Sequence, residues 1–168
     1  MKNFVYPAAA LALLASGATL AAELTDNIAV SAEVTAACTG LTATDVDFGP
    51  AGAADTTQAD VSSTITVTCD TGTNWTIEID YGMNPVAATP PIRNVTSSVA
   101  PSQGERMDYY IFQDAARTIG WGTVAEGEEM TGTGTGAADL HDAFFSLDRT
   151  SGNSPGVYTD LVEVKLIF

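Results

Sequence analysis

Residues 158–168, Tyr-Thr-Asp-Leu-Val-Glu-Val-Lys-Leu-Ile-Phe, alternate apolar and polar side chains up to the last residue of the chain. This period of two is typical of a β-strand with one apolar face. The apolar face consists of Tyr158, Val162, Val164, Leu166 and Phe168. Because terminal residues are usually frayed unless they are tied down, we expect Phe168 to be buried and this strand to be built into a sheet.

Residues 24–35, near the other end of the chain, repeat the pattern in Leu-Thr-Asp-Asn-Ile-Ala-Val-Ser-Ala-Glu-Val-Thr. One face of this second predicted strand carries Leu24, Ile28, Val30, Ala32 and Val34. An unpaired apolar strand at the front and an open sheet edge at the back would equip the chain to join copies of itself.

Residues 1–22 have the layout of a secretory signal peptide. Lys2 precedes an apolar run over residues 4–14, and small residues follow up to Ala22. The apolar run is shorter than the ~20 residues of a membrane-spanning helix, and no later segment approaches that length. We therefore expect an exported protein without a transmembrane segment, and the remainder of the chain has the size of one domain.

Two cysteines, Cys38 and Cys69, follow the predicted signal peptide. In an exported chain, a pair of cysteines favours a disulfide over the alternative of two buried free thiols. The formal net charge of −15 makes nucleic acid and anionic membranes poor partners, because such a surface repels phosphate groups.

Helical periodicity is nearly absent, and short alternating runs separated by Gly, Thr, Ser and Asp predict an all-β sandwich or barrel. The expected strands cover residues 43–48, 61–69, 75–81, 107–113, 119–121 and 139–147. Residues 85–101 hold four of the seven prolines and are expected to form an irregular or edge segment. Residues 127–136 are expected to form a hairpin region, in which glycines at alternate positions suggest a close backbone approach or a weak edge. The candidate core positions of the 139–147 strand are Leu140, Ala143, Phe145 and Leu147.

Groups that could perform catalysis are scarce. His141 is the only histidine, and only Asp139 of its two neighbouring aspartates can share its strand face. A solvated strand start is the favoured interpretation of these residues, and the sequence predicts no catalytic residues, no metal site and no cofactor. Trp75 and Trp121 are expected in the core. Trp121 lies between two glycines and is the better candidate for partial exposure, for example in a sugar-binding groove.

Several segments together resemble the spore coat protein U-like family, which includes the major pilins of archaic chaperone–usher pili. The first is Cys38 shortly after the first alternating strand, and the second is the run that ends at Cys69. The more specific pieces are an Asp-Ala-Ala-Arg-Thr turn after an aromatic strand and the terminal strand. The matching segments are residues 65–69, 110–118, 120–122 and 156–168.

The resemblance implies an incomplete immunoglobulin-like β-sandwich of Greek-key topology that lacks its last strand and is completed by donor-strand exchange. In similar pilins a periplasmic chaperone first fills the resulting groove, and the N-terminal extension of the next subunit replaces it at an outer-membrane usher. We therefore divide the chain into a signal peptide (1–22), a donor-strand extension (23–36) and an immunoglobulin-like pilin domain (37–168). The donor strand would present Leu24, Ile28, Val30, Ala32 and Val34, and Tyr158, Val162, Val164, Leu166 and Phe168 would form the strand at the edge of the groove.

The function expected from this resemblance is that of a pilin. The subunit would polymerise with copies of itself into a surface fibre, reached through the periplasm, that serves adhesion or biofilm formation. The alternative is a binding module, either a secreted coat protein or a glycan-binding tip adhesin that uses Trp121. An enzyme is not expected.

Overall fold

The computed structural model describes residues 23–149 and 152–168, so the predicted signal peptide lies outside the described residues. Within the described residues, the chain divides into a segment that ends at Glu33 and a compact unit over Val34–Phe168. Residues 23–37 form no strand, and nearly all of their side chains are exposed. The alternating N-terminal segment is therefore not a strand of its own chain's fold.

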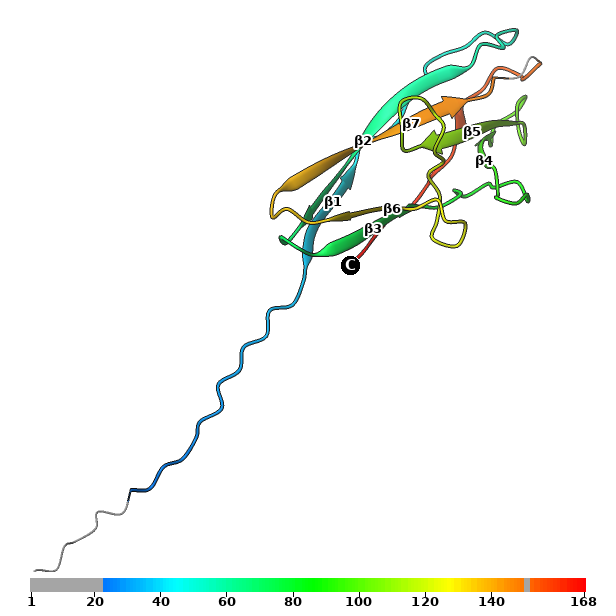
Figure 1. Ribbon diagram of the computed structural model, residues 1–168. Coiled ribbons are helices and arrows are strands. Elements are labelled where there is room, and N and C mark those ends of the chain that lie inside the picture. The colour runs from blue at the N-terminus through cyan, green and yellow to red at the C-terminus, as the bar shows by residue number, and fades with distance from the viewer. Residues whose placement is uncertain (1–22, 150–151) are drawn as a thin grey trace, which may run out of the picture. The chain divides into compact units, whose positions relative to one another are not determined.

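The described part of the chain contains strands and no helix (Figure 1). The strands are β1 (Cys38–Ala43), β2 (Ala59–Cys69), β3 (Asn74–Ile79), β4 (Arg93–Ser97), β5 (Arg106–Phe112), β6 (Met130–Thr133), β7 (Ala138–Leu147), β8 (Tyr158–Thr159) and β9 (Val164–Ile167). A six-stranded sheet has the order β1-β2-β7-β5-β4-β8, and a three-stranded sheet has the order β6-β3-β9. All of the pairings are antiparallel, as in the predicted immunoglobulin-like sandwich.

The core lies between the two sheets and is supplied by alternate residues of the strands. On β2, Ile65, Val67 and Cys69 are buried while the residues between them are partly exposed, which is the period of two expected for a strand with one apolar face. The three-stranded sheet contributes Trp75, Ile77 and Ile79 from β3. The predicted strands at 61–69, 75–81, 107–113 and 139–147 therefore agree with β2, β3, β5 and β7.

β4 corrects the prediction for residues 85–101. It lies inside the six-stranded sheet, between β5 and β8, although prolines flank it on both sides. Its buried members are largely polar, so an apolar alternation could not reveal it. Arg93 illustrates how they are accommodated: its guanidinium donates hydrogen bonds to the carbonyl oxygens of Asp80 (2.7 Å), Ile79 (2.8 Å) and Trp121 (2.8 Å).

Two other predictions, the burial of Leu140 and the strand at residues 43–48, are wrong, whereas the core position expected for Trp121 is confirmed. Leu140 is 64% exposed because it shares a face of β7 with the outward-pointing residues, whereas His141 points inward with Ala143 and Phe145. Trp121 is fully buried, as expected of a core residue and unlike the partly exposed alternative, and its indole N–H donates to the carbonyl oxygen of Ile77 at 3.2 Å. The strand expected at 43–48 is instead β1, which ends at residue 43, and the chain beyond it leaves the sheet.

The glycines of the 132–136 repeat have a packing role. Gly132 is paired with Trp75 across β6 and β3, and a Cβ atom built on Gly132 would lie 2.6 Å from Cη2 of that indole ring. A Cβ atom on Gly134 would lie 2.7 Å from the carbonyl oxygen of Cys69. The expected close backbone approach is present, and β6 is also an edge strand of its sheet.

Candidate functional site: a groove beside the terminal strand

An open groove with a volume of about 850 Å³ lies within the Val34–Phe168 unit. Its floor comes from both sheets and is mostly apolar. The floor residues include Ile65, Ile79, Val95, Met107, Tyr109, Ala143, Phe145 and Leu147. The two walls are the segments 43–53 and 153–164, so residues close to the two ends of the domain border one cavity.

The first wall is the segment that was expected to be a strand. Pairing with β2 ends after Ala43, apart from one further backbone–backbone hydrogen bond from the Thr44 N–H to the Thr64 carbonyl oxygen (3.2 Å) and side-chain hydrogen bonds between Thr44 and residues 63 and 64. Val46 and Phe48 nevertheless pack against the core. Arg149 holds the far end of this wall, because its guanidinium donates to the Phe48 carbonyl oxygen at 2.9 Å.

The second wall is the terminal strand region. Tyr158, Val162, Val164 and Leu166 are partly buried and pack against the core, while the residues that alternate with them in the 161–167 stretch are exposed. Of the predicted groove-edge residues, Tyr158, Val162 and Val164 line the groove, and Leu166 and Phe168 do not. Phe168 is 62% exposed, so the prediction of a buried last residue is wrong.

β9 has an unpaired edge. It is the last strand of the three-stranded sheet and pairs only with β3 among the described strands. The N–H and C=O groups along the other side of β9 are consequently available to a further strand. An apolar groove beside an unpaired strand edge can accept an extended apolar segment by adding it to the sheet.

Asp160 places a carboxylate between Tyr158 and Val162 on this wall. Its carboxylate accepts hydrogen bonds from the Tyr109 hydroxyl (2.8 Å), the Met83 N–H (3.0 Å) and the Asn84 side-chain amide (3.3 Å). Burial, and to a smaller extent the hydrogen bond to Asp160, raises the pKa of Tyr109. Asp160 is not among the residues predicted from the sequence, although a carboxylate in phase with Tyr158 and Val162 is a signal for a satisfied polar group on a buried face.

The predicted donor residues carry apolar side chains that are exposed to solvent. Leu24 and Val34 are almost fully exposed, Ile28 and Val30 are each 90% exposed, and Ala32 is exposed as well. Isolated exposed apolar residues are common, but an exposed series on one face of an extended segment marks an interaction site.

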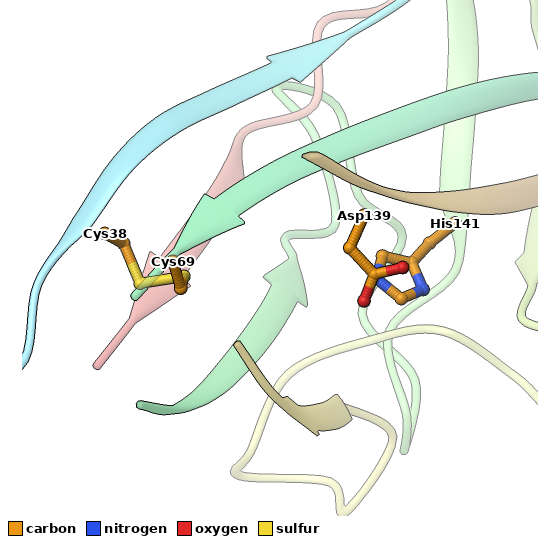
Figure 2. The surroundings of a disulfide bond; sticks show 4 residues. All are labelled: Cys38, Cys69, Asp139 and His141. Carbon is orange, nitrogen blue, oxygen red and sulfur yellow. A yellow bond between two sulfur atoms is a disulfide. The ribbon is translucent and has the colours of Figure 1, made fainter. Parts of the chain in front are cut away.

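Cys38 and Cys69 form a disulfide, which joins the first residue of β1 to the last residue of β2 (Figure 2). The free-thiol alternative is thereby excluded. Figure 2 also shows Asp139 and His141 directed toward each other, with His141 Nε2 3.3 Å from Asp139 Oδ2. The imidazole packs against Trp75 with a centroid separation of 4.9 Å.

Within residues 23–149 and 152–168, no group of three or more His, Cys, Asp or Glu side chains is placed to hold a metal ion. The same residues include no helix long and apolar enough to span a membrane.

The family of this chain follows from its match to a known domain profile. The profile of the Spore Coat Protein U domain matches residues 24–165. The chain belongs to the Spore Coat Protein U domain family. The matched region of this Spore Coat Protein U domain contains the groove and both of its walls.

Among solved structures, the domain is similar to a chain of the CsuC–CsuE chaperone–tip adhesion subunit pre-assembly complex from the archaic chaperone–usher Csu pili of Acinetobacter baumannii. The TM-score is 0.54 and the sequence identity is 20%, with 80% of this chain and 40% of the other chain covered. This Spore Coat Protein U domain protein thus spans less than half of the chain it resembles, and the likeness establishes the shared fold. A comparison with curated protein sequences gives no significant match.

Proposed function

We propose that this protein is a structural, non-enzymatic subunit of a chaperone–usher surface pilus and that it polymerises by donor-strand complementation. In this reaction, residues 23–36 of one copy enter the groove of the next copy and add a strand along its second wall, beside the start of β9 and the residues that precede it. The observation that carries the proposal is the apolar groove beside the unpaired edge of β9, together with an exposed alternating segment in the same chain.

The energetics favour this pairing. Each buried Leu, Ile or Val side chain contributes on the order of 1.5–3 kcal/mol before the costs of ordering the segment. Main-chain hydrogen bonds to β9 would add to this and would define which residues face the groove. Leaving the same side chains in water would instead expose both an apolar strand and an open sheet edge, which is an aggregation hazard.

The proposed partners follow from the same groove. A periplasmic chaperone would occupy it before assembly, and an outer-membrane usher would exchange the chaperone for the next subunit. The structural likeness to a subunit of a chaperone–subunit pre-assembly complex supports the chaperone as a partner. The predicted signal peptide at residues 1–22 supports export through the periplasm to a fibre on the cell surface, where adhesion or biofilm formation is the expected role.

The structure weakens the main argument for a glycan-binding tip adhesin or coat protein. Trp121 was the predicted stacking residue, but it is fully buried and its indole N–H is bonded to the backbone of β3. A polymerising stalk subunit accounts for both the groove and the exposed apolar segment, and we favour it for that reason.

A matched pair of variants tests the proposal. Val30→Asp puts a carboxylate on the groove-facing side of the donor segment, where burying it without a partner is costly, so fibre formation is expected to be abolished. Ser31→Asp introduces the same charge on the opposite face and is expected to leave assembly close to wild type. Electron microscopy of the cell surface and gel analysis of unheated, SDS-resistant polymers would measure both. Normal fibres from both variants would refute donation by residues 23–36.

A further inference from the structure

The second wall of the groove carries a feature that an apolar donor strand must accommodate, the hydrogen-bonded carboxylate of Asp160. We infer that Asp160 and Tyr109 set the register of the incoming strand, with Ala32 of the neighbouring copy lying opposite Asp160. This inference rests on the proposed donor-strand function and specifies which donor residue lies opposite which residue of the groove.

The wall of the groove offers a limited number of inward positions. Alternate residues of the second wall that line the groove are Tyr158, Asp160, Val162 and Val164. Leu166 continues the same face but lies outside the groove lining. This alternate series of the second wall therefore has one charged position, Asp160, between Tyr158 and Val162.

The donor segment has an uninterrupted apolar series of the same length. Ile28, Val30, Ala32 and Val34 occupy alternate positions, and Asp26 interrupts the series on its N-terminal side. Ala32 is the smallest member. The donor series therefore has one small side chain among four, just as the wall series has one charged side chain among four, and each lies one position from the end of its series.

Direction and face restrict the possible pairings. Every pairing among the described strands is antiparallel, and antiparallel pairing is slightly more stable per residue than parallel pairing. Directly opposed residues of an antiparallel pair lie on the same face of the sheet. With Ile28, Val30, Ala32 and Val34 inside the groove, Ile28 faces Val164 at the start of β9. Val30 and Ala32 then face Val162 and Asp160 in the stretch that precedes β9, and Val34 faces Tyr158 of β8, at the edge of the other sheet.

Shifting the strand by two residues in either direction is unfavourable. A shift one way places Val30 opposite Asp160 and brings Asp26 opposite Val164, where its carboxylate would enter the apolar part of the groove. A shift the other way places Val34 opposite Asp160. In both cases a branched side chain meets a carboxylate that Tyr109 and Asn84 already hold in place, and only the proposed register puts a methyl group there.

Cysteine cross-linking in assembled fibres tests the register. One preparation carries a donor cysteine (Val30→Cys) and a second carries an acceptor cysteine (Val162→Cys), and the two are mixed during assembly. Opposed residues lie about 4.5–5.5 Å apart between their Cα or Cβ atoms, which a disulfide spans, whereas a pair displaced by two residues lies about 7–8 Å apart. Ile28→Cys with Val164→Cys is a second pair in the same register, and Val30→Cys with Val164→Cys is the displaced control.

We expect covalent dimers on non-reducing gels from both opposed pairs and none from the displaced pair. Dimers from the displaced pair, or fibres in which no pair cross-links, would overturn the register while leaving donor-strand assembly intact. Absence of fibres from the wild-type chain would overturn the proposed function itself, and the register with it.

A size change at the polar position gives an independent test. Ala32→Leu should reduce incorporation into fibres by about tenfold or more, because the larger side chain overlaps the carboxylate and its partners. Ala29→Leu, the same substitution on the opposite face of the segment, should leave incorporation unchanged. If Ala32 faced Val162 instead, leucine would gain apolar contact, so unimpaired incorporation of Ala32→Leu would also overturn the inference.

Discussion

Replacing Gly132 by alanine tests the packing between β6 and the core. The added Cβ atom would lie 2.6 Å from Cη2 and 2.7 Å from Cε2 of Trp75, well inside ordinary van der Waals contact. The indole has little freedom to move away, because Trp75 is 3% exposed and its ring also packs against His141. The backbone of β3 is likewise held, with β6 on one side and β9 on the other.

Two opposing effects determine the size of the change. Overpacking a well-filled core costs about 1–3 kcal/mol, and replacing a glycine within a strand recovers about 0.5–1 kcal/mol of backbone entropy. We expect a net loss of about 1–2 kcal/mol in the free energy of unfolding. For a domain of this size, each kcal/mol corresponds to a fall of about 3–6 °C in the midpoint of thermal unfolding.

Thermal unfolding followed by tryptophan fluorescence would measure the effect on the full chain under one set of conditions. Gly52→Ala is the matched control, since a Cβ atom there meets nothing within 4 Å and Gly52 does not have a positive φ. The control should be neutral or stabilising by up to about 1 kcal/mol. A Gly132→Ala midpoint equal to or above that of wild type would refute the argument that the indole fills the space above β6.

Three further perturbations have defined outcomes. Phe145→Ala removes a buried ring from β7 and should lower the free energy of unfolding by about 3–5 kcal/mol, as measured by urea unfolding. Cys38→Ser should cost about 2–5 kcal/mol by removing the disulfide to Cys69, and peptide mass mapping of exported wild-type protein without reductant should find the two cysteines linked. Hydrogen bonds, the strongest from Tyr158 and the next from Ser154, lower the pKa of Glu105 below its ordinary 4.5. The Glu105 carboxylate therefore stabilises the fold above pH 4.5 and loses this contribution as the pH falls through its lowered pKa. The stability difference between wild type and Glu105→Gln should therefore shrink when unfolding is measured at successively lower pH below about 4.5.

The strands that could be predicted from the sequence are those with one continuously apolar face. Ile65, Val67 and Cys69 on β2, and Trp75 and Ile77 on β3, point to the core at every second residue because the sheet has one solvated side. Period-two patterns arise directly from this arrangement, so composition and alternation were sufficient for these strands.

The strand β4 could not be found in this way because its buried side chains are polar. Arg93 is satisfied by carbonyl oxygens of residues 79, 80 and 121, and the partner of Ser97 is the Ser102 hydroxyl at 2.7 Å. The partners of Arg93 are brought close by the tertiary fold, whereas Ser102 follows Ser97 within the loop after β4. Leu140 shows the converse error. It was predicted to be a core residue because it is apolar, although it lies on the same face of β7 as the exposed residues.

The candidate site was predicted in part. Alternation indicated the face of the terminal strand that carries Tyr158, Val162 and Val164. It did not indicate the opposite wall, because residues 44–53 border the groove without forming a strand. The role of Asp160 depends on Tyr109 and Asn84, which lie far from it in the sequence.

The position of the disulfide has a mechanical consequence. Cys38 is the first residue of β1, an edge strand, and it is bonded to the end of β2, which is paired on both sides. A pull exerted through the segment that precedes Cys38 therefore reaches β2 through covalent bonds, without first unzipping the hydrogen bonds between β1 and β2. In a fibre under tension the load at each joint would fall on the long β2–β7 pairing, whereas reduction of the disulfide would turn the same pull into a peeling force on β1.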